Sequence, residues 1–187
     1  MPILFRHTIR KDDRDYRVEF SFDDEAIMNN SAGFEIKAGT KNPASDMWTD
    51  ITLHGEVRLA EELLVLSHEG REIARVSLNL PLQDLADAAG FDIDIDHSDM
   101  IDRAIGSLGL EGIIQLIPTD PFLGCIIKGA ASTAIGQVIR CWHPNRNTRP
   151  FTDLARRIGS CLRDHATRML FTFIYRAGRC AAFGGAR

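Results

Sequence analysis

The sequence predicts an α+β fold, in which an amino-terminal antiparallel sheet or small sandwich of about six strands precedes a helical layer packed on it. Two observations favour this class. Apolar and polar residues alternate up to about residue 80, as in half-buried strands, and apolar residues recur at helical spacing after Pro81. Strands that come before the helices, rather than between them, are typical of helices gathered on one face of a sheet.

The predicted strands are short segments in which apolar residues take every second position. In the clearest of them, Tyr16, Val18, Phe20 and Phe22 share one face, while the residues between them are polar. Gly70 can supply the positive φ that a tight hairpin turn needs. The six expected strands cover residues 3–9, 16–22, 34–36, 51–57, 63–66 and 73–78.

The second half carries helix signals. A first helix is expected from Pro81 to a cap at Gly90, and a second between Ser98 and Leu108. A third opens at Asp120-Pro121. Residues 142–150 have the composition of a loop, after which Thr152 is expected to cap a long fourth helix. Residues 170–175 are apolar all round, which fits either a fully buried helix end or a strand.

Small residues form a ridge along the third helix. Cys125, Gly129, Ser132 and Gly136 recur at helical spacing, and small side chains permit another helix to approach closely. The ridge therefore predicts a helix–helix contact, either within the chain or with a second copy.

Charge divides the chain into two halves of opposite sign. Residues 1–99 have a net charge of −11 (10 basic against 21 acidic), and residues 100–187 have +7 (12 basic against 5 acidic). We expect an acidic β-rich layer at 1–80 and a basic, mainly helical layer at 81–187, folding as one cooperative domain. The split indicates complementary surfaces but names no activity.

Cysteine usage and apolar runs bear on location. All four cysteines lie in the last third of the chain, and we expect free thiols packed as small hydrophobes. The segment Met1–His7 has only a three-residue apolar run, which is too short for the core of a secretory signal. The longest apolar stretch, residues 121–139, is expected to be buried in protein. These observations predict a cytoplasmic protein that does not contact a membrane, and no cofactor motif is found.

Three aspartates alternate with apolar residues in Phe91-Asp92-Ile93-Asp94-Ile95-Asp96. On an extended strand, Asp92, Asp94 and Asp96 would form a row on one face, and such a row can hold Mg²⁺ or Mn²⁺. The alternation resembles the metal-binding strand of polymerase-β-like nucleotidyltransferases, which implies phosphoryl or nucleotidyl transfer. In the favoured interpretation, the apolar residues point inward, and the aspartates are solvated or face the basic helices.

Cysteine and histidine also recur together. Cys161 and His165 are four residues apart, so one helical face presents both, and Cys141 and His143 from the preceding loop can complete a tetrahedral zinc shell. The alternative is that Cys161 and His165 belong to the apolar stripe of the helix. We favour packing over zinc.

Arginines supply most of the basic charge after residue 130, where lysine is absent. Guanidinium groups bind phosphate and carboxylate well, so the expected basic face of Arg149, Arg156, Arg157 and Arg163 is compatible with nucleic acid. Neutralisation of the acidic sheet, within the chain or between copies, explains the same arginines and is favoured.

These patterns together predict a non-enzymatic binding protein that associates with itself or with another protein through acidic and basic surfaces. The two alternatives are a metal-dependent phosphoryl- or nucleotidyl-transfer enzyme centred on the three aspartates and a nucleic-acid-binding protein.

Overall fold

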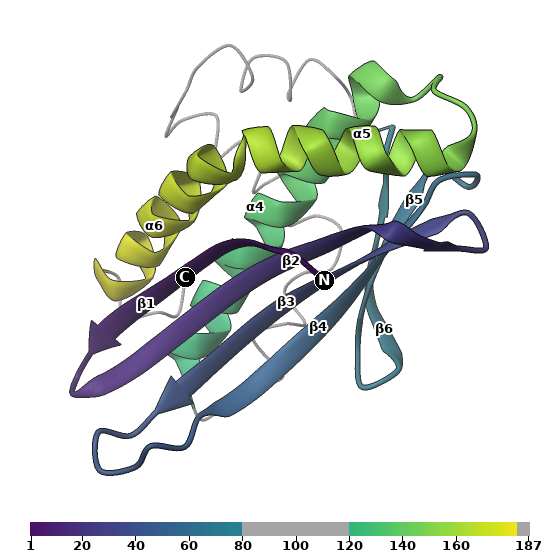
Figure 1. Ribbon diagram of the computed structural model, residues 1–187. Coiled ribbons are helices and arrows are strands. Elements are labelled where there is room, and N and C mark those ends of the chain that lie inside the picture. The colour runs from purple at the N-terminus through teal and green to yellow at the C-terminus, as the bar shows by residue number, and fades with distance from the viewer. Residues whose placement is uncertain (80–119, 183–187) are drawn as a thin grey trace.

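The α+β architecture is confirmed by a computed structural model, which describes residues 1–79 and 120–182. Within these residues, six antiparallel strands come first and three helices follow. The helices lie on one face of the sheet, with α4 crossing behind the strands in Figure 1. The expected helices at 81–90 and 98–108 and the three aspartates lie outside the described residues.

The strands form one open sheet rather than a sandwich. They pair in sequence order, each with its neighbour along the chain, as a continuous meander. Their bounds are Ile3–Lys11 (β1), Arg14–Met28 (β2), Ser31–Lys41 (β3), Thr49–Arg58 (β4), Leu63–His68 (β5) and Arg71–Ser77 (β6). All six predicted strands are present, and β2 and β3 extend well beyond their predicted bounds.

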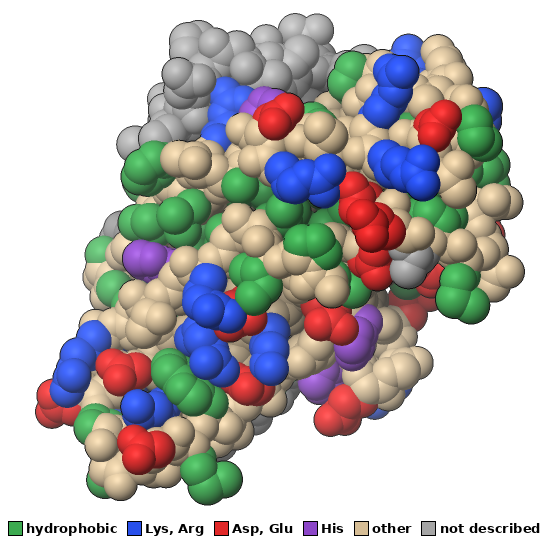
Figure 2. Space-filling model, in the orientation of Figure 1, with side chains coloured by type: hydrophobic (Ala, Val, Ile, Leu, Met, Phe, Trp, Pro, Cys, Tyr) green, Lys and Arg blue, Asp and Glu red, His purple; other side chains and the backbone are tan. Residues whose placement is uncertain are grey.

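Alternation along the strands separates a buried face from a solvated one. Val18, Phe20 and Phe22 of β2 are fully buried beneath the helices, as predicted. On the opposite face, charged side chains pair across strands, including Arg6 with Glu19 at 2.8 Å. Figure 2 shows blue and red side chains mixed over these strands. The solvated face therefore neutralises much of its own charge.

Turn chemistry sets the sheet register. Asp12 and Asp13 both have positive φ in the turn between β1 and β2, as do Asn29 and Asn30 in the next turn. Two-residue turns of this kind match the twist of antiparallel strands, and Asn and Asp tolerate positive φ better than most residues.

Helix α4 spans Pro121–Asn145. The Asp120 side chain accepts a hydrogen bond from the backbone N–H of Leu123 at 3.0 Å, and Pro121 occupies the first helical turn, so the predicted start is confirmed. The predicted loop at 142–150 is partly wrong, because the helix continues through its first four residues. By length and composition α4 is the one described helix able to cross a membrane, but it is mostly buried inside the protein.

The expected single long helix at the carboxy terminus is two helices. Helix α5 spans Phe151–Asp164 and α6 spans Ala166–Ala182, with a break at His165. The expected Thr152 cap is wrong, since Pro150 stands at the cap position and makes no side-chain cap bond. Residues 170–175 are helical, which resolves the alternative in favour of helix.

Ring contacts attach the helices to the sheet. Phe173 of α6 stacks on Phe5 of β1 with ring centroids 5.6 Å apart, and Phe122 of α4 meets Tyr16 of β2 edge-on at 4.8 Å. The small-residue ridge of α4 receives α6 of the same chain, because a Cβ built on Gly129 would lie 3.3 Å from the Cβ of Arg176. The predicted helix–helix contact is thus made within the chain.

Candidate functional site

All four cysteines form disulfides, so the expectation of free thiols is wrong. Cys125 of α4 bonds to Cys180 of α6, and Cys141 of α4 bonds to Cys161 of α5. Their Cα atoms lie 6.0 and 5.7 Å apart, within the range that disulfide geometry allows. The packing of the three helices brings the cysteines together, and their spacing in the sequence does not show which helices become neighbours.

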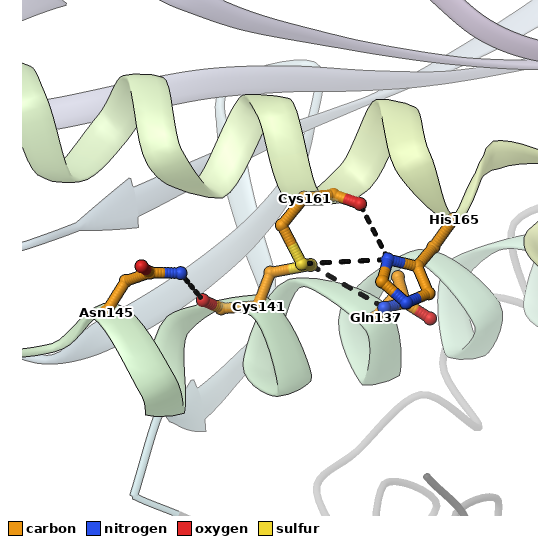
Figure 3. The surroundings of a disulfide bond; sticks show 5 residues. All are labelled: Gln137, Cys141, Asn145, Cys161 and His165. Carbon is orange, nitrogen blue, oxygen red and sulfur yellow. Dashed lines mark hydrogen bonds between the residues drawn. A yellow bond between two sulfur atoms is a disulfide. The ribbon is translucent and has the colours of Figure 1, made fainter.

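The bond between Cys141 and Cys161 is surrounded by polar side chains (Figure 3). His165 follows α5 one turn after Cys161, and its Nδ1 lies 3.8 Å from Cys161 Sγ. The same Nδ1 lies 2.8 Å from the backbone oxygen of Cys161. Because a carbonyl oxygen only accepts hydrogen bonds, Nδ1 carries the proton in this arrangement.

Cys141 has polar partners of its own, one turn away on either side along α4. The Gln137 side-chain amide donates to Cys141 Sγ at 3.5 Å, and Asn145 donates to the Cys141 backbone oxygen at 2.8 Å. Sequence reasoning did not identify Gln137. The feature that could have identified Gln137 is its position four residues before a cysteine on a largely apolar helix, where the two side chains are neighbours.

The two cysteines of this disulfide differ in exposure to solvent. Cys141 is 0% exposed, whereas Cys161 and His165 are half-buried. Approach from outside therefore meets Cys161 first. A half-buried cysteine is open to an attacking thiolate, and attack on Cys161 Sγ releases Cys141 as a thiolate.

Positive charge lies close to the disulfide along the chain. Arg140 precedes Cys141, and burial, together with the charges of Arg168 and Arg176, lowers the pKa of Arg140 to about 10. Arg176 is itself buried and donates to Thr133 of α4.

The structure brings together three of the four expected zinc ligands. The ligand atoms of Cys141, Cys161 and His165 all lie within 4.8 Å of one another. His143 does not join them, and its ring packs against Trp142 instead, with centroids 5.2 Å apart. The expectation failed because Cys141 and His143 are on a helix rather than a loop, and residues two apart on a helix do not share a face.

The expected basic face is largely committed to contacts within the protein. Arg163 forms an ion pair with Asp24 of β2 at 3.0 Å, and Arg156 lies 3.6 Å from Asp153. Arg149 donates to backbone oxygens of its own loop and lies over the Phe151 ring. Arg157 is exposed on α5.

The Arg163 contact places α5 on the sheet. Asp24 is 5% exposed, and Gly159 allows this close approach, because a Cβ at that position would lie 2.2 Å from Asp24 Oδ2. The favoured prediction that arginines of the helices neutralise the sheet holds for this pair, whereas other sheet charges pair with one another.

Two aromatic side chains of the arginine-rich half, Trp142 and Tyr175, offer little surface for stacking on nucleic-acid bases. Trp142 is 1% exposed, and Tyr175 is half-buried.

The chain matches none of the protein families, curated proteins or solved structures with which it was compared.

Proposed function

We propose that the protein is a non-enzymatic binding protein that associates with a second copy of itself through oppositely charged surfaces. The observation that carries the proposal is the separation of charge between the two layers. Residues 1–79 have a net charge of −5 (10 basic against 15 acidic), and residues 120–182 have +7 (10 basic against 3 acidic). Complementary potentials on one molecule favour association between copies.

The surfaces involved follow from which charges remain exposed. On the solvated sheet face, Arg17 pairs with Asp50 at 3.3 Å and other charges pair similarly, so this face is nearly balanced. The excess acidity is carried by turns at both ends of the sheet, where Asp12 and Asp13 are exposed at one end and Glu62 at the other. The excess basicity is spread over the helical layer, of which α5 carries three arginines against two aspartates, and Figure 2 shows basic side chains along this helix.

The basic surface of α5 and the acidic turns are different parts of the molecule. A contact between them is therefore head-to-tail and does not pair one patch with itself. Because both surfaces are exposed, the attraction is screened over about 10 Å at 0.1 M salt, and association should weaken as the salt concentration rises.

The test is sedimentation equilibrium at tens of micromolar protein, in about 20 mM and about 500 mM NaCl. We expect oligomers at low salt and weaker association at high salt. Arg157→Glu should weaken association by about tenfold, because it places a like charge against the acidic turns. Arg71→Glu, which makes the same change in net charge at an exposed position of β6, is the matched control and should have less than a twofold effect.

A monomer of 20.8 kDa at both salt concentrations contradicts the proposal. Equal effects of Arg157→Glu and Arg71→Glu also contradict it, because net charge rather than the α5 surface would then control association. The same samples titrated with a single-stranded oligonucleotide test the nucleic-acid alternative.

A further inference from the structure

We propose that Cys141, Cys161 and His165 form a site for a thiophilic divalent cation such as Zn²⁺ when the disulfide between the two cysteines is reduced. The oxidised site, which the structure shows, holds no free thiolate and cannot bind the ion. The reduced site offers two thiolates and one imidazole, which are the ligands that zinc prefers. Metal binding at this place is thus controlled by thiol redox chemistry.

The distances fit a tetrahedral shell. With Zn–S of about 2.3 Å and Zn–N of about 2.0 Å, a sulfur and a nitrogen on one zinc ion lie about 3.6 Å apart. The observed separation of Cys161 Sγ and His165 Nδ1 is 3.8 Å. These two atoms therefore already stand at the distance of two ligands on one ion.

The sulfurs must move apart by a small amount. Two sulfurs on one tetrahedral zinc ion lie about 3.8 Å apart, against about 2.05 Å in a disulfide. Rotation of the cysteine side chains accommodates this change, since the two Cα atoms are 5.7 Å apart on adjacent helices. His165 must release the Cys161 carbonyl and move its proton to Nε2 for Nδ1 to bind the metal.

The surrounding residues support metal binding. The Gln137 N–H that lies 3.5 Å from Cys141 Sγ can donate to the thiolate, which holds the ligand in place. Three protein ligands leave a fourth position for water, as in open zinc sites. Within residues 1–79 and 120–182, no other group of three His, Cys, Asp or Glu side chains meets in this way.

The reductant is a protein or small-molecule dithiol, which supplies two electrons. Its thiolate attacks the Sγ of Cys161, the more exposed cysteine, and the Cys141–Cys161 bond breaks as a mixed disulfide forms. Cys141 leaves as a thiolate that accepts the Gln137 N–H. The second thiol of the reductant then displaces Cys161 and closes its own disulfide. Binding of the divalent ion keeps both cysteines as thiolates, so their two protons pass to solvent and the site is neutral.

The experiment uses the full chain, reduced with a phosphine without oxygen, desalted and titrated with Co²⁺ alone. We expect one Co²⁺ per chain, with the thiolate charge-transfer and visible bands of tetrahedral cobalt, displaced by Zn²⁺. The oxidised protein should show neither band. Far-ultraviolet circular dichroism follows folding, and loss of helix in the reduced chain overturns the proposal, because the site needs α4 and α5 in place.

Three variants separate this site from the other cysteines. His165→Gln keeps all four cysteines and should weaken Co²⁺ binding by about tenfold or more. Cys141→Ser with Cys161→Ser should abolish the bands, and Cys125→Ser with Cys180→Ser should leave them. If either double variant fails to fold, His165→Gln decides. Unchanged binding in His165→Gln overturns the proposal, as does retention of the bands without Cys141 and Cys161.

Discussion

The two disulfides close the same helical layer but differ in position and surroundings. The Cys125–Cys180 bond joins residues 55 positions apart, and both of its cysteines are buried, at 7% and 4% exposure. The Cys141–Cys161 bond joins residues 20 positions apart, and it has a half-buried cysteine beside an imidazole and a buried cysteine beside an amide. The position of the first bond favours a role in stabilising the fold, whereas the position of the second favours reaction with an external thiol.

Removal of each disulfide should separate the two roles. In the chain-entropy description, closing a loop of 55 residues contributes about 4 kcal/mol and a loop of 20 about 3 kcal/mol. Cys125→Ala with Cys180→Ala should therefore lower the free energy of unfolding more than Cys141→Ala with Cys161→Ala. Urea denaturation followed by tryptophan fluorescence measures both. The reverse order would remove the structural distinction between the two bonds.

The anchor beneath the reactive disulfide can be tested next. An alanine Cβ at position 159 would lie 2.2 Å from Asp24 Oδ2 and push α5 away from β2. Gly159→Ala should cost about 2 kcal/mol through overpacking, measured by urea denaturation. Gly178→Ala is the matched control, because a Cβ there meets nothing within 4 Å, and it should be neutral or slightly stabilising. A stable Gly159→Ala would show that the close contact with Asp24 does not hold α5.

Much of the fold could be predicted because it depends on local periodicity. Alternation identified the buried face of β2 through Val18, Phe20 and Phe22, and Asp120-Pro121 marked the start of α4. The break at His165 could not be predicted, because neither glycine nor proline stands there and the apolar stripe continues across it. Tertiary packing of α6 on β1 through Phe5 and Phe173 accompanies the change of direction.

The candidate site was predicted in part, and the errors have the same origin. The four-residue spacing of Cys161 and His165 correctly predicted that the two residues lie close together, because four residues make about one helical turn. Pairing with Cys141 as a disulfide required the helices to be neighbours, which no local pattern shows. His143 was included because residues 142–145 have loop composition but are helical. Asp24 lies in an acidic run that is typical of a solvated segment, yet it is buried against α5.

Susceptibility to reduction should separate the disulfides kinetically. A limiting amount of dithiol should reduce Cys141–Cys161 at least about tenfold faster than Cys125–Cys180, because only the former includes a half-buried cysteine. Differential alkylation before and after unfolding, read by mass spectrometry, gives both rates. Gln137→Leu should slow the faster reaction, since it removes the donor to the departing Cys141 sulfur. Equal rates for the two bonds in the folded protein would contradict the assignment of roles.

The smallest effect concerns the hydrogen bond that ties the sheet to the start of α4, near Cys125. The Tyr16 hydroxyl donates to Asp120 Oδ2 at 3.2 Å, and burial, reinforced by the Asp120 carboxylate, raises the pKa of Tyr16 above its ordinary 10.0. The unfolded chain therefore loses the phenol proton at a lower pH than the folded protein. The contribution to stability is complete below pH 10 and is lost as the pH rises through the folded-state pKa.

Tyr16→Phe should cost about 1 kcal/mol at neutral pH, and the difference from the native chain should shrink above pH 10. Urea denaturation across the alkaline range measures this. A difference that stays constant with pH would mean that the phenol proton is not held by the fold. Unaltered reduction of Cys141–Cys161 in Tyr16→Phe is expected as well, because this bond lies at the opposite end of α4.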